Sequence, residues 1–449
     1  MKYMTSILNF FLVFLLLVSQ PVRAENKALM ELLKALHNNG TIDAQTYQLV
    51  KQVAQSESET EAQTVRSITR EEVEKTADKV VEEKVKLAKK EDKPGDLVRL
   101  GGRLQVDAAT YREDGSRHND GTEIRRARLF AEGDLGEAWG YKLQYDFTAD
   151  GIEGIQDAYL DYKGFESFKI RTGHFKEPFS LQNMTSSKYV LFMERGLPYL
   201  FAEGRNLGIQ LATNGKNWTA AGGAFGDGRD GEEDDNDEGY GVSGRVTYAP
   251  LYENDRFLHL GASASYRSTG SKNELRFRER PESHLTDTRL VDTGTFDADN
   301  YGRVVGEAAF IYGPFHVQGE YYHTSIDRDI DANPDLDFSG YYVEGGWMLT
   351  GESMNYKPNK GSYSKVTPKA PVGKGGIGAW QLAMRFSSLD LTDEDIMGGE
   401  EENFTIGLNW YATPNIRFIA NYVNVLDVFN GANEDDEPEV FQLRSQIEF

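Results

Sequence analysis

Apolar and polar side chains alternate at the end of the chain, over residues 441–449. Phe441, Leu443, Ile447 and Phe449 occupy odd positions, and polar or charged residues separate them. A two-residue period places successive side chains on opposite faces of a β-strand. One face of the predicted strand is therefore apolar and the other is charged, which is typical of a sheet that meets lipid on one side and water on the other.

The same alternation recurs along the chain from residue 96 onward. The first example sets Val98, Leu100, Leu104 and Val106 against polar neighbours. The spacing is roughly 22 residues for each strand with its connection, enough for the ~9–11 residues with which a strand crosses a membrane. We predict sixteen strands, near residues 98–107, 122–134, 141–147, 154–163, 166–175, 205–213, 216–226, 239–250, 256–268, 301–312, 314–323, 337–350, 377–388, 402–412, 415–426 and 438–449.

These strands predict an all-β transmembrane fold, a 16-stranded antiparallel outer-membrane β-barrel over residues 94–449. A closed sheet pairs every backbone group internally, as lipid requires. A barrel of this size encloses an aqueous channel instead of a packed core. The composition agrees, because alternating strands need apolar residues at only half of their positions, and the mean hydropathy is −0.56.

The first 93 residues differ from the rest. Lys2, the apolar run 7–18 and the small-residue site 21–24 predict a secretory signal peptide over residues 1–24, with an uncleaved anchor as the alternative. Residues 25–93 predict a periplasmic helical hairpin followed by a thin heptad pattern. That pattern is compatible with a coiled coil, a frayed single helix or a disordered linker.

The net charge of −23 is concentrated in three runs, residues 227–238, 390–402 and 434–439, which together carry −19. We interpret these runs as solvated external loops, with a specific calcium site as the alternative. No cysteine is present and the seven histidines are scattered, so we expect no metal site, no cofactor and no enzyme activity. A pI of about 4.8 gives no support for nucleic-acid binding.

Two connections differ from these acidic runs. Residues 176–205 form the third external connection and are rich in apolar residues, so we expect this segment to fold into the barrel interior. Residues 350–376 contain five lysines and one acid, and strand parity places them on the periplasmic side.

Several motifs resemble the phosphate-selective porin family, porins O and P. They lie at residues 122–133, 141–147, 173–180, 186–190, 193–195, 347–352, 378–386 and 407–411. The resemblance implies a trimeric sixteen-stranded barrel that passes phosphate or other anions along arginines to a constriction. It also implies that Arg125, Arg126 and Lys188 belong to that constriction.

Alternation assigns basic residues to the lumen, although nine acids share that face. Arg125 would face lipid, at a cost of ~2–4 kcal/mol at mid-membrane, unless a β-bulge or a subunit interface accommodates it. We predict an anion-binding constriction of Arg125, Arg126, Arg128 and Lys188, because a guanidinium holds an oxyanion bidentately. The predicted pore-lining residues are Arg99, Arg103, Lys142, Lys169, Arg171, Arg245, Arg303, Arg385, Arg417 and Arg444.

The sequence therefore predicts an outer-membrane porin for passive uptake of anions, phosphate or polyphosphate above all. A general-diffusion porin without phosphate selectivity and a structural outer-membrane anchor are the alternatives. The expected partners are inorganic phosphate, outer-membrane lipid and lipopolysaccharide, two further copies in a homotrimer, and the barrel-assembly machinery through Phe449.

Overall fold

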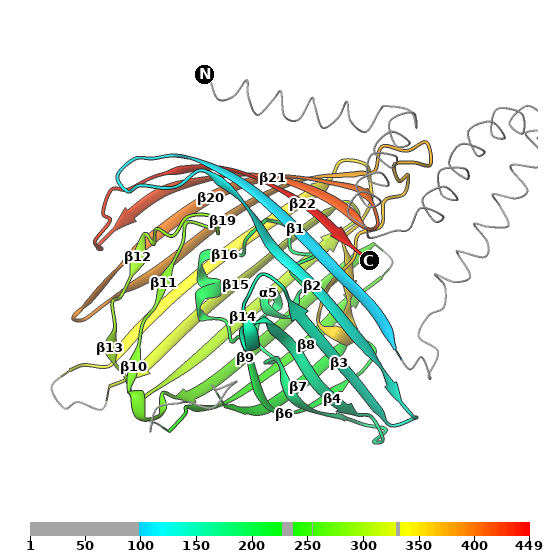
Figure 1. Ribbon diagram of the computed structural model, residues 1–449, viewed down its shortest axis with the longest axis horizontal. Helices are drawn as coiled ribbons and strands as arrows, with labels where there is room; N and C mark the ends of the chain where they lie inside the picture. Colours follow the sequence, from blue (N-terminus) through cyan, green and yellow to red (C-terminus); the bar gives the residue numbers. More distant parts are fainter. Residues whose placement is uncertain (1–97, 227–236, 254, 329–332) are drawn as a thin grey trace, which may run out of the picture. The chain divides into compact units, whose positions relative to one another are not determined.

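Sixteen antiparallel strands close into a barrel in the computed structural model, which describes residues 98–226, 237–253, 255–328 and 333–449 (Figure 1). Each strand pairs with its neighbours along the barrel, and β22 closes it against β1. The strands are β1 (Arg99–Arg112), β2 (Gly121–Leu135), β3 (Trp139–Asp146), β4 (Ile155–Tyr162), β5 (Lys169–Lys176), β6 (Arg205–Asn214), β7 (Trp218–Gly226), β8 (Tyr240–Tyr252), β9 (Arg256–Ser268), β14 (Asn300–Tyr312), β15 (Phe315–Asp327), β16 (Leu336–Met348), β19 (Ala379–Asp393), β20 (Ile396–Thr413), β21 (Ile416–Phe429) and β22 (Glu439–Glu448).

The predicted fold and its sixteen strands are confirmed. The predicted signal peptide and periplasmic helical segment lie outside the described residues and stay predictions. Among the residues that the structure describes, no helix has the length and apolar character needed to cross a membrane.

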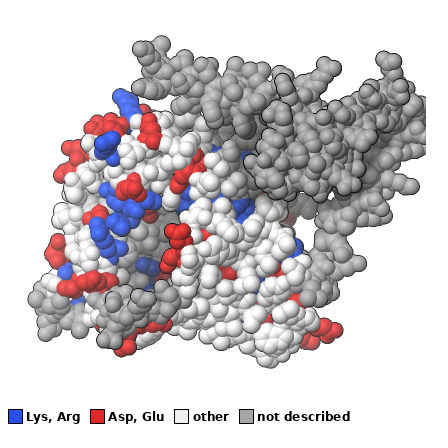
Figure 2. Space-filling model, in the orientation of Figure 1, with Lys and Arg blue, Asp and Glu red and all other residues white. Residues whose placement is uncertain are grey.

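Alternation builds two different barrel faces. On β14, Val304, Phe310 and Tyr312 are exposed on the outer face, whereas Arg303 and Glu307 are buried on the inner face. The wall over β3, β4 and β7 is largely free of charge in Figure 2, and charged side chains gather toward β10–β13. The outer face is therefore suited to hydrocarbon and the inner face to water and ions.

Aromatic side chains line the outer edge of the barrel near Phe449. Trp380 and Trp410 stack with ring centroids 5.4 Å apart, and Phe418 continues this stack at 5.2 Å. Phe315 and Trp347 stack at 5.7 Å beside the next short turn. This row is typical of the aromatic girdle that marks a membrane interface.

Three long connections pack inside the barrel, and we call them the first (177–204), second (269–299) and third (349–378) lumen segments. The first contains α5 (Leu181–Met184) and η2 (Leu197–Phe201), and Figure 1 shows α5 within the barrel. The first and second segments start from the edge opposite Phe449, and the third from the edge that carries Phe449. The short elements of the other two segments are η3 (Gly270–Lys272), β10 (Glu274–Leu275), β11 (Arg278–Glu279), β12 (Val291–Asp292), β13 (Phe296–Asp297), β17 (Asn355–Lys357), η4 (Pro358–Lys360) and β18 (Ser362–Ser364); η1 (Gly151–Gly154) lies between β3 and β4.

Apolar contacts bury these segments against the inner wall. Phe179 and Phe201 of the first segment belong to one buried cluster with Tyr322 and Tyr342 of the wall. Glycine makes the close approach possible: a Cβ at Gly340 would lie 2.9 Å from Pro198 Cβ. The expected inward folding of residues 176–205 is therefore confirmed.

The acidic run 390–402 is not a loop, and that interpretation was wrong. β19 continues to Asp393 and β20 starts at Ile396, so only a tight turn with Glu394 at φ +50° separates them. Glu401 faces inward, where its Oε1 accepts a hydrogen bond of 2.8 Å from Asn403. The acids do not interrupt the strands because the β19–β20 turn lies at the barrel edge opposite Phe449. Charged side chains at the polar end of a strand do not contact lipid.

Candidate functional site

A cavity of about 850 Å³ lies in the lumen between the β1–β6 wall and the three lumen segments. Its described lining contains fourteen Lys and Arg residues against five Asp and Glu residues, which reverses the sign of the acidic chain as a whole. The basic residues are Arg99, Arg103, Arg125, Arg126, Arg128, Lys142, Arg171, Lys176, Lys188, Arg195, Arg205, Arg280, Lys357 and Lys360.

A β-bulge turns Arg125 toward the cavity. Gln105 pairs with Arg126, but Val106 pairs with Ile124, so Arg125 is the extra residue of β2. Its Nε and Nη2 donate hydrogen bonds of 2.9 and 3.0 Å to the Glu194 carboxylate. The predicted bulge is therefore present, and it removes the cost of placing this arginine in lipid.

Arg126 and Arg128 share the inner face of β2, as alternation predicted, but their partners differ. Arg126 Nη1 donates to Gln105 Oε1 at 3.0 Å, whereas Arg128 Nε donates to Asp146 Oδ2 at 2.5 Å. Arg128 is thus neutralised by a wall carboxylate. Arg126 has only a neutral partner.

Hydrogen bonds and ion pairs hold the first lumen segment in place. Ser180 Oγ caps α5 by accepting from Asn183 N at 3.0 Å, and the Glu320 carboxylate accepts from Leu181 N and Gln182 N at 2.6 and 3.0 Å. Arg417 donates to the carbonyls of Val190 and Leu191. The wall therefore determines where the polar groups of this segment point.

Lys188 lines the cavity, but it also forms an ion pair. Its Nζ lies 2.7 Å from Glu448 Oε2, and Lys365 of the third lumen segment lies 2.9 Å from Glu448 Oε1. Tyr189 OH donates to the same carboxylate at 3.2 Å. Burial lowers the pKa of Lys188, against which Glu448 acts to raise it. Glu448 thus joins two lumen segments through one side chain.

Four predicted pore-lining residues lie at the cavity. Arg103 is the one without a carboxylate partner; Arg99 pairs with Glu132, Lys142 with Asp157 at 2.8 Å, and Arg171 with Asp161 at 2.7 Å.

The other six predicted pore-lining residues are not part of this lining. Five of them are buried on the inner wall in contacts with acids or with the lumen segments, and Lys169 pairs with Asp161 at 3.3 Å. The contacts of the five are Arg245 with Glu307 and the Gly361 carbonyl, Arg303 with Glu203, Arg385 with Glu282, Arg417 with the carbonyls named above, and Arg444 with Asp107.

Alternation missed the basic residues that the non-alternating parts bring to the cavity. Arg195 lies on the first lumen segment and Arg280 on the second. Lys176 is the last residue of β5 and Arg205 the first residue of β6, the two strands that the first segment connects. The unusual apolar character of 176–205 was a signal for Lys176, Arg195 and Arg205, and Arg195 also lies in the motif at 193–195, but Arg280 had no such signal. The third segment also enters the lumen, with Lys357 and Lys360 at the cavity, although strand parity predicted only its side of the membrane.

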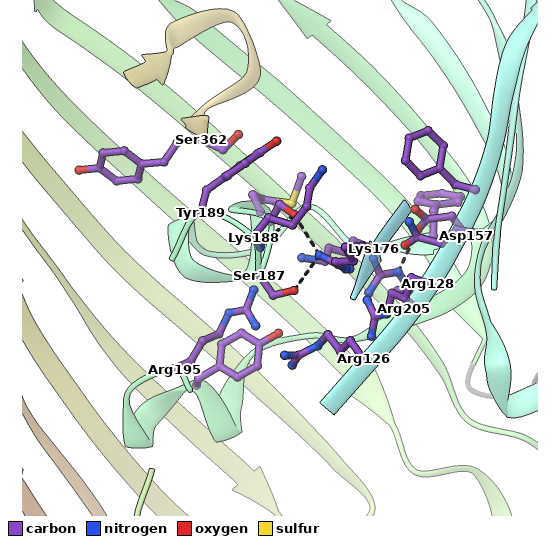
Figure 3. Close-up of a pocket in the computed structure, with 18 of the residues that line it drawn as sticks. Arg126, Arg128, Asp157, Lys176, Ser187, Lys188, Tyr189, Arg195, Arg205 and Ser362 are labelled. Atoms are coloured by element: carbon purple, nitrogen blue, oxygen red, sulfur yellow. Dashed lines mark hydrogen bonds and ion pairs between the residues drawn. The ribbon is translucent and has the colours of Figure 1, made fainter. Parts of the chain in front are cut away.

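Besides Lys357 of the third lumen segment, four cations at the cavity have no ion-pair partner among the described residues: Arg103, Arg126, Lys176 and Arg195. Figure 3 shows the last three around the same space as Ser187 and Lys188. Lys176 Nζ donates to the Asn183 carbonyl. Arg195 donates to the carbonyls of Gln182 and Thr185 at 3.0 Å each and lies over the Tyr199 ring.

Arg103 retains an unsatisfied donor. Its Nη1 donates to Ser187 Oγ at 2.8 Å and Ser186 Oγ at 3.3 Å, but its buried Nε has no hydrogen-bond partner in the described structure. A buried donor and an uncompensated charge are both costly. An oxyanion in the cavity would compensate the charge.

Two acids at the cavity differ in their ionisation. Burial would raise the pKa of Glu194, but Arg125, Arg126 and Arg444 hold it well below the ordinary range. Burial raises the pKa of Glu279, in the second lumen segment, to about 7. Over the described residues, no group of three or more His, Cys, Asp or Glu side chains is arranged to hold a metal ion.

Comparisons with known proteins agree with this architecture. Residues 98–449 match the family model of phosphate-selective porin O and P. An uncharacterised protein of Caulobacter vibrioides is 32% identical over 346 residues, covering 73% of this chain and 68% of the relative. Porin O of Pseudomonas aeruginosa is 27% identical over 396 residues, covering 78% and 88%. A loop L8 deletion mutant of the Vibrio cholerae outer membrane protein OmpT superimposes with a TM-score of 0.51 at 13% identity, covering 78% of this chain and 99% of that one, which supports the fold alone.

Proposed function

Because the chain belongs to the phosphate-selective porin O and P family, we propose that its lumen cavity selects anions and holds phosphate-like oxyanions in passage. The protein is a porin of the bacterial outer membrane and not an enzyme. The proposed property is selectivity for anions, and the proposed cause is the set of basic residues at the cavity.

The observation that carries the proposal is the set of four cations without carboxylate partners, Arg103, Arg126, Lys176 and Arg195. Paired arginines contribute little net field, because the adjacent carboxylate cancels them at a distance. The four unpaired groups retain their charge toward the cavity. Arg103 and the Ser186 and Ser187 hydroxyls offer donors beside one another, which suits a tetrahedral oxyanion.

Conduction also requires that the ion leaves. Sites of moderate strength placed in succession allow this, because an ion can exchange one donor for the next. Arg125, Arg128 and Lys188 surround the same cavity but each forms an ion pair with an acid. We infer that they provide weaker positions around the unpaired cations.

Planar-bilayer recording tests the proposal through phosphate block of chloride current and the reversal potential in a KCl gradient. The wild-type channel is expected to prefer chloride over potassium and to be blocked by phosphate. Arg126→Ala combined with Arg128→Ala should raise the conductance and weaken the block. Arg303→Ala, whose side chain contacts Glu203 away from the cavity, is the control. A double mutant with normal yield and unchanged block would favour a general-diffusion porin.

A further inference from the structure

Two wall arginines hold the Glu194 carboxylate of the first lumen segment. Arg125 grips both of its oxygens, at 2.9 and 3.0 Å, and Arg444 Nη2 donates to Glu194 Oε1 at 2.8 Å. A guanidinium holds phosphate or sulfate through the same pair of parallel N–H groups. The first lumen segment therefore supplies its own oxyanion to two wall arginines.

This carboxylate also faces the cavity. Glu194 and Arg125 both line it, and Arg126 next to them has no carboxylate partner among the described residues. The low pKa of Glu194, set against burial by Arg125, Arg126 and Arg444, keeps it charged under working conditions. Arg125 is thus already bound to Glu194 when an oxyanion passes, and the charge of Glu194 repels that oxyanion.

We propose that Glu194 is a specificity-determining residue, a resident anion that limits how tightly the cavity holds a passing oxyanion. The inference rests on the proposed anion selectivity and adds a group that weakens anion binding. A channel that bound its solute too firmly would be blocked by it. Glu194 keeps Arg125 from adding a further fork to the site, whereas the fork of Arg444 is held by Asp107 in either case.

A purely structural role predicts the opposite result. If Glu194 only fixed the first lumen segment to the wall, its loss would loosen the segment, widen the pore and weaken anion block. If it is a resident anion, its loss exposes Arg125 to the cavity and strengthens block. The sign of the change therefore separates the two roles.

Glu194→Gln is the decisive variant, because the amide keeps the size and one acceptor oxygen but removes the charge. The phosphate concentration that halves the chloride current should fall about tenfold, the factor expected for one unit charge acting across roughly 12 Å at an effective dielectric constant of ~20. The reversal potential in a KCl gradient should move further toward chloride. Weaker or unchanged block, with a normal yield of channels, overturns the inference.

Glu203→Gln is the matched control. Glu203 lies on the same lumen segment and pairs with Arg303 at 3.2 Å, but it does not line the cavity, so phosphate block should not tighten. If Glu194→Gln yields no channels, Glu194→Asp replaces it. The shorter side chain no longer reaches both arginines, so block should tighten by a smaller factor, and a loss of block overturns the inference.

The same recordings separate this inference from the proposed function. A wild-type channel without phosphate block overturns the proposed function. In that case Glu194→Gln must still shift the reversal potential toward chloride, and the absence of that shift overturns the role of Glu194.

Discussion

Replacing Arg103 by alanine tests the cavity at a cation that no carboxylate neutralises. The change removes an uncompensated guanidinium whose Nη1 donates to Ser187 and Ser186 and whose buried Nε has no partner in the described structure. A hydrogen bond to a charged group contributes ~1.5–3 kcal/mol. Loss of one such bond to the passing anion corresponds to a block about 10- to 150-fold weaker.

The assay is the concentration dependence of phosphate block of chloride current in single channels. Arg103→Lys keeps the charge but not the planar fork, so its loss of block should be smaller than that of the alanine variant. Lys169→Ala is the control, because Lys169 is a wall cation that pairs with Asp161 and does not line the cavity. If Arg103→Ala changes block by less than about threefold with normal channel yield, phosphate passes without contacting Arg103 and the assignment fails.

Three further outcomes are expected. Glu279, with its pKa raised to about 7, is neutral below that pH and negative above it, so raising the pH from 6 to 8 should reduce chloride preference in a KCl gradient, and Glu279→Gln should abolish this dependence. Neutralising the acids of residues 227–238 should raise anion conductance at low salt and have little effect at 1 M, where the Debye length is ~3 Å; cation preference that persists after neutralisation would contradict anion selectivity. We predict a heat-modifiable homotrimer, so an unheated detergent sample that sediments as a monomer would exclude that assembly.

The sequence predicts the wall far better than the contents of the lumen. Period-two alternation determines which side of a strand meets lipid, and the cost of Arg125 in lipid correctly indicated a bulge in β2. Alternation makes no statement about the lumen segments, so Arg195 was not predicted. It also assigns a face without assigning a partner, so Arg303 and Arg444 were grouped with Arg103 although acids neutralise them.

Charge alone was a poor guide to loops. The run 390–402 was interpreted as a solvated loop because of its acids, although β19 and β20 continue through most of it. The lysine-rich connection 350–376 is the opposite case, because charged residues there belong to a segment that packs inside the barrel. Its β17–β18 hairpin enters the lumen, because Tyr356 and Tyr363 pack in a buried cluster there. Three-dimensional packing, which no local pattern contains, decided both cases.

The contacts of Glu448 connect the bore of the channel to the assembly of its wall. Glu448 lies on β22 opposite Arg103 of β1, in the pairing that joins the two ends of the sheet, and it binds Lys188 and Lys365 from two lumen segments. An unclosed sheet keeps Arg103 and Glu448 apart. The seam at which the barrel closes is therefore also the place where one wall carboxylate binds two of the lumen segments.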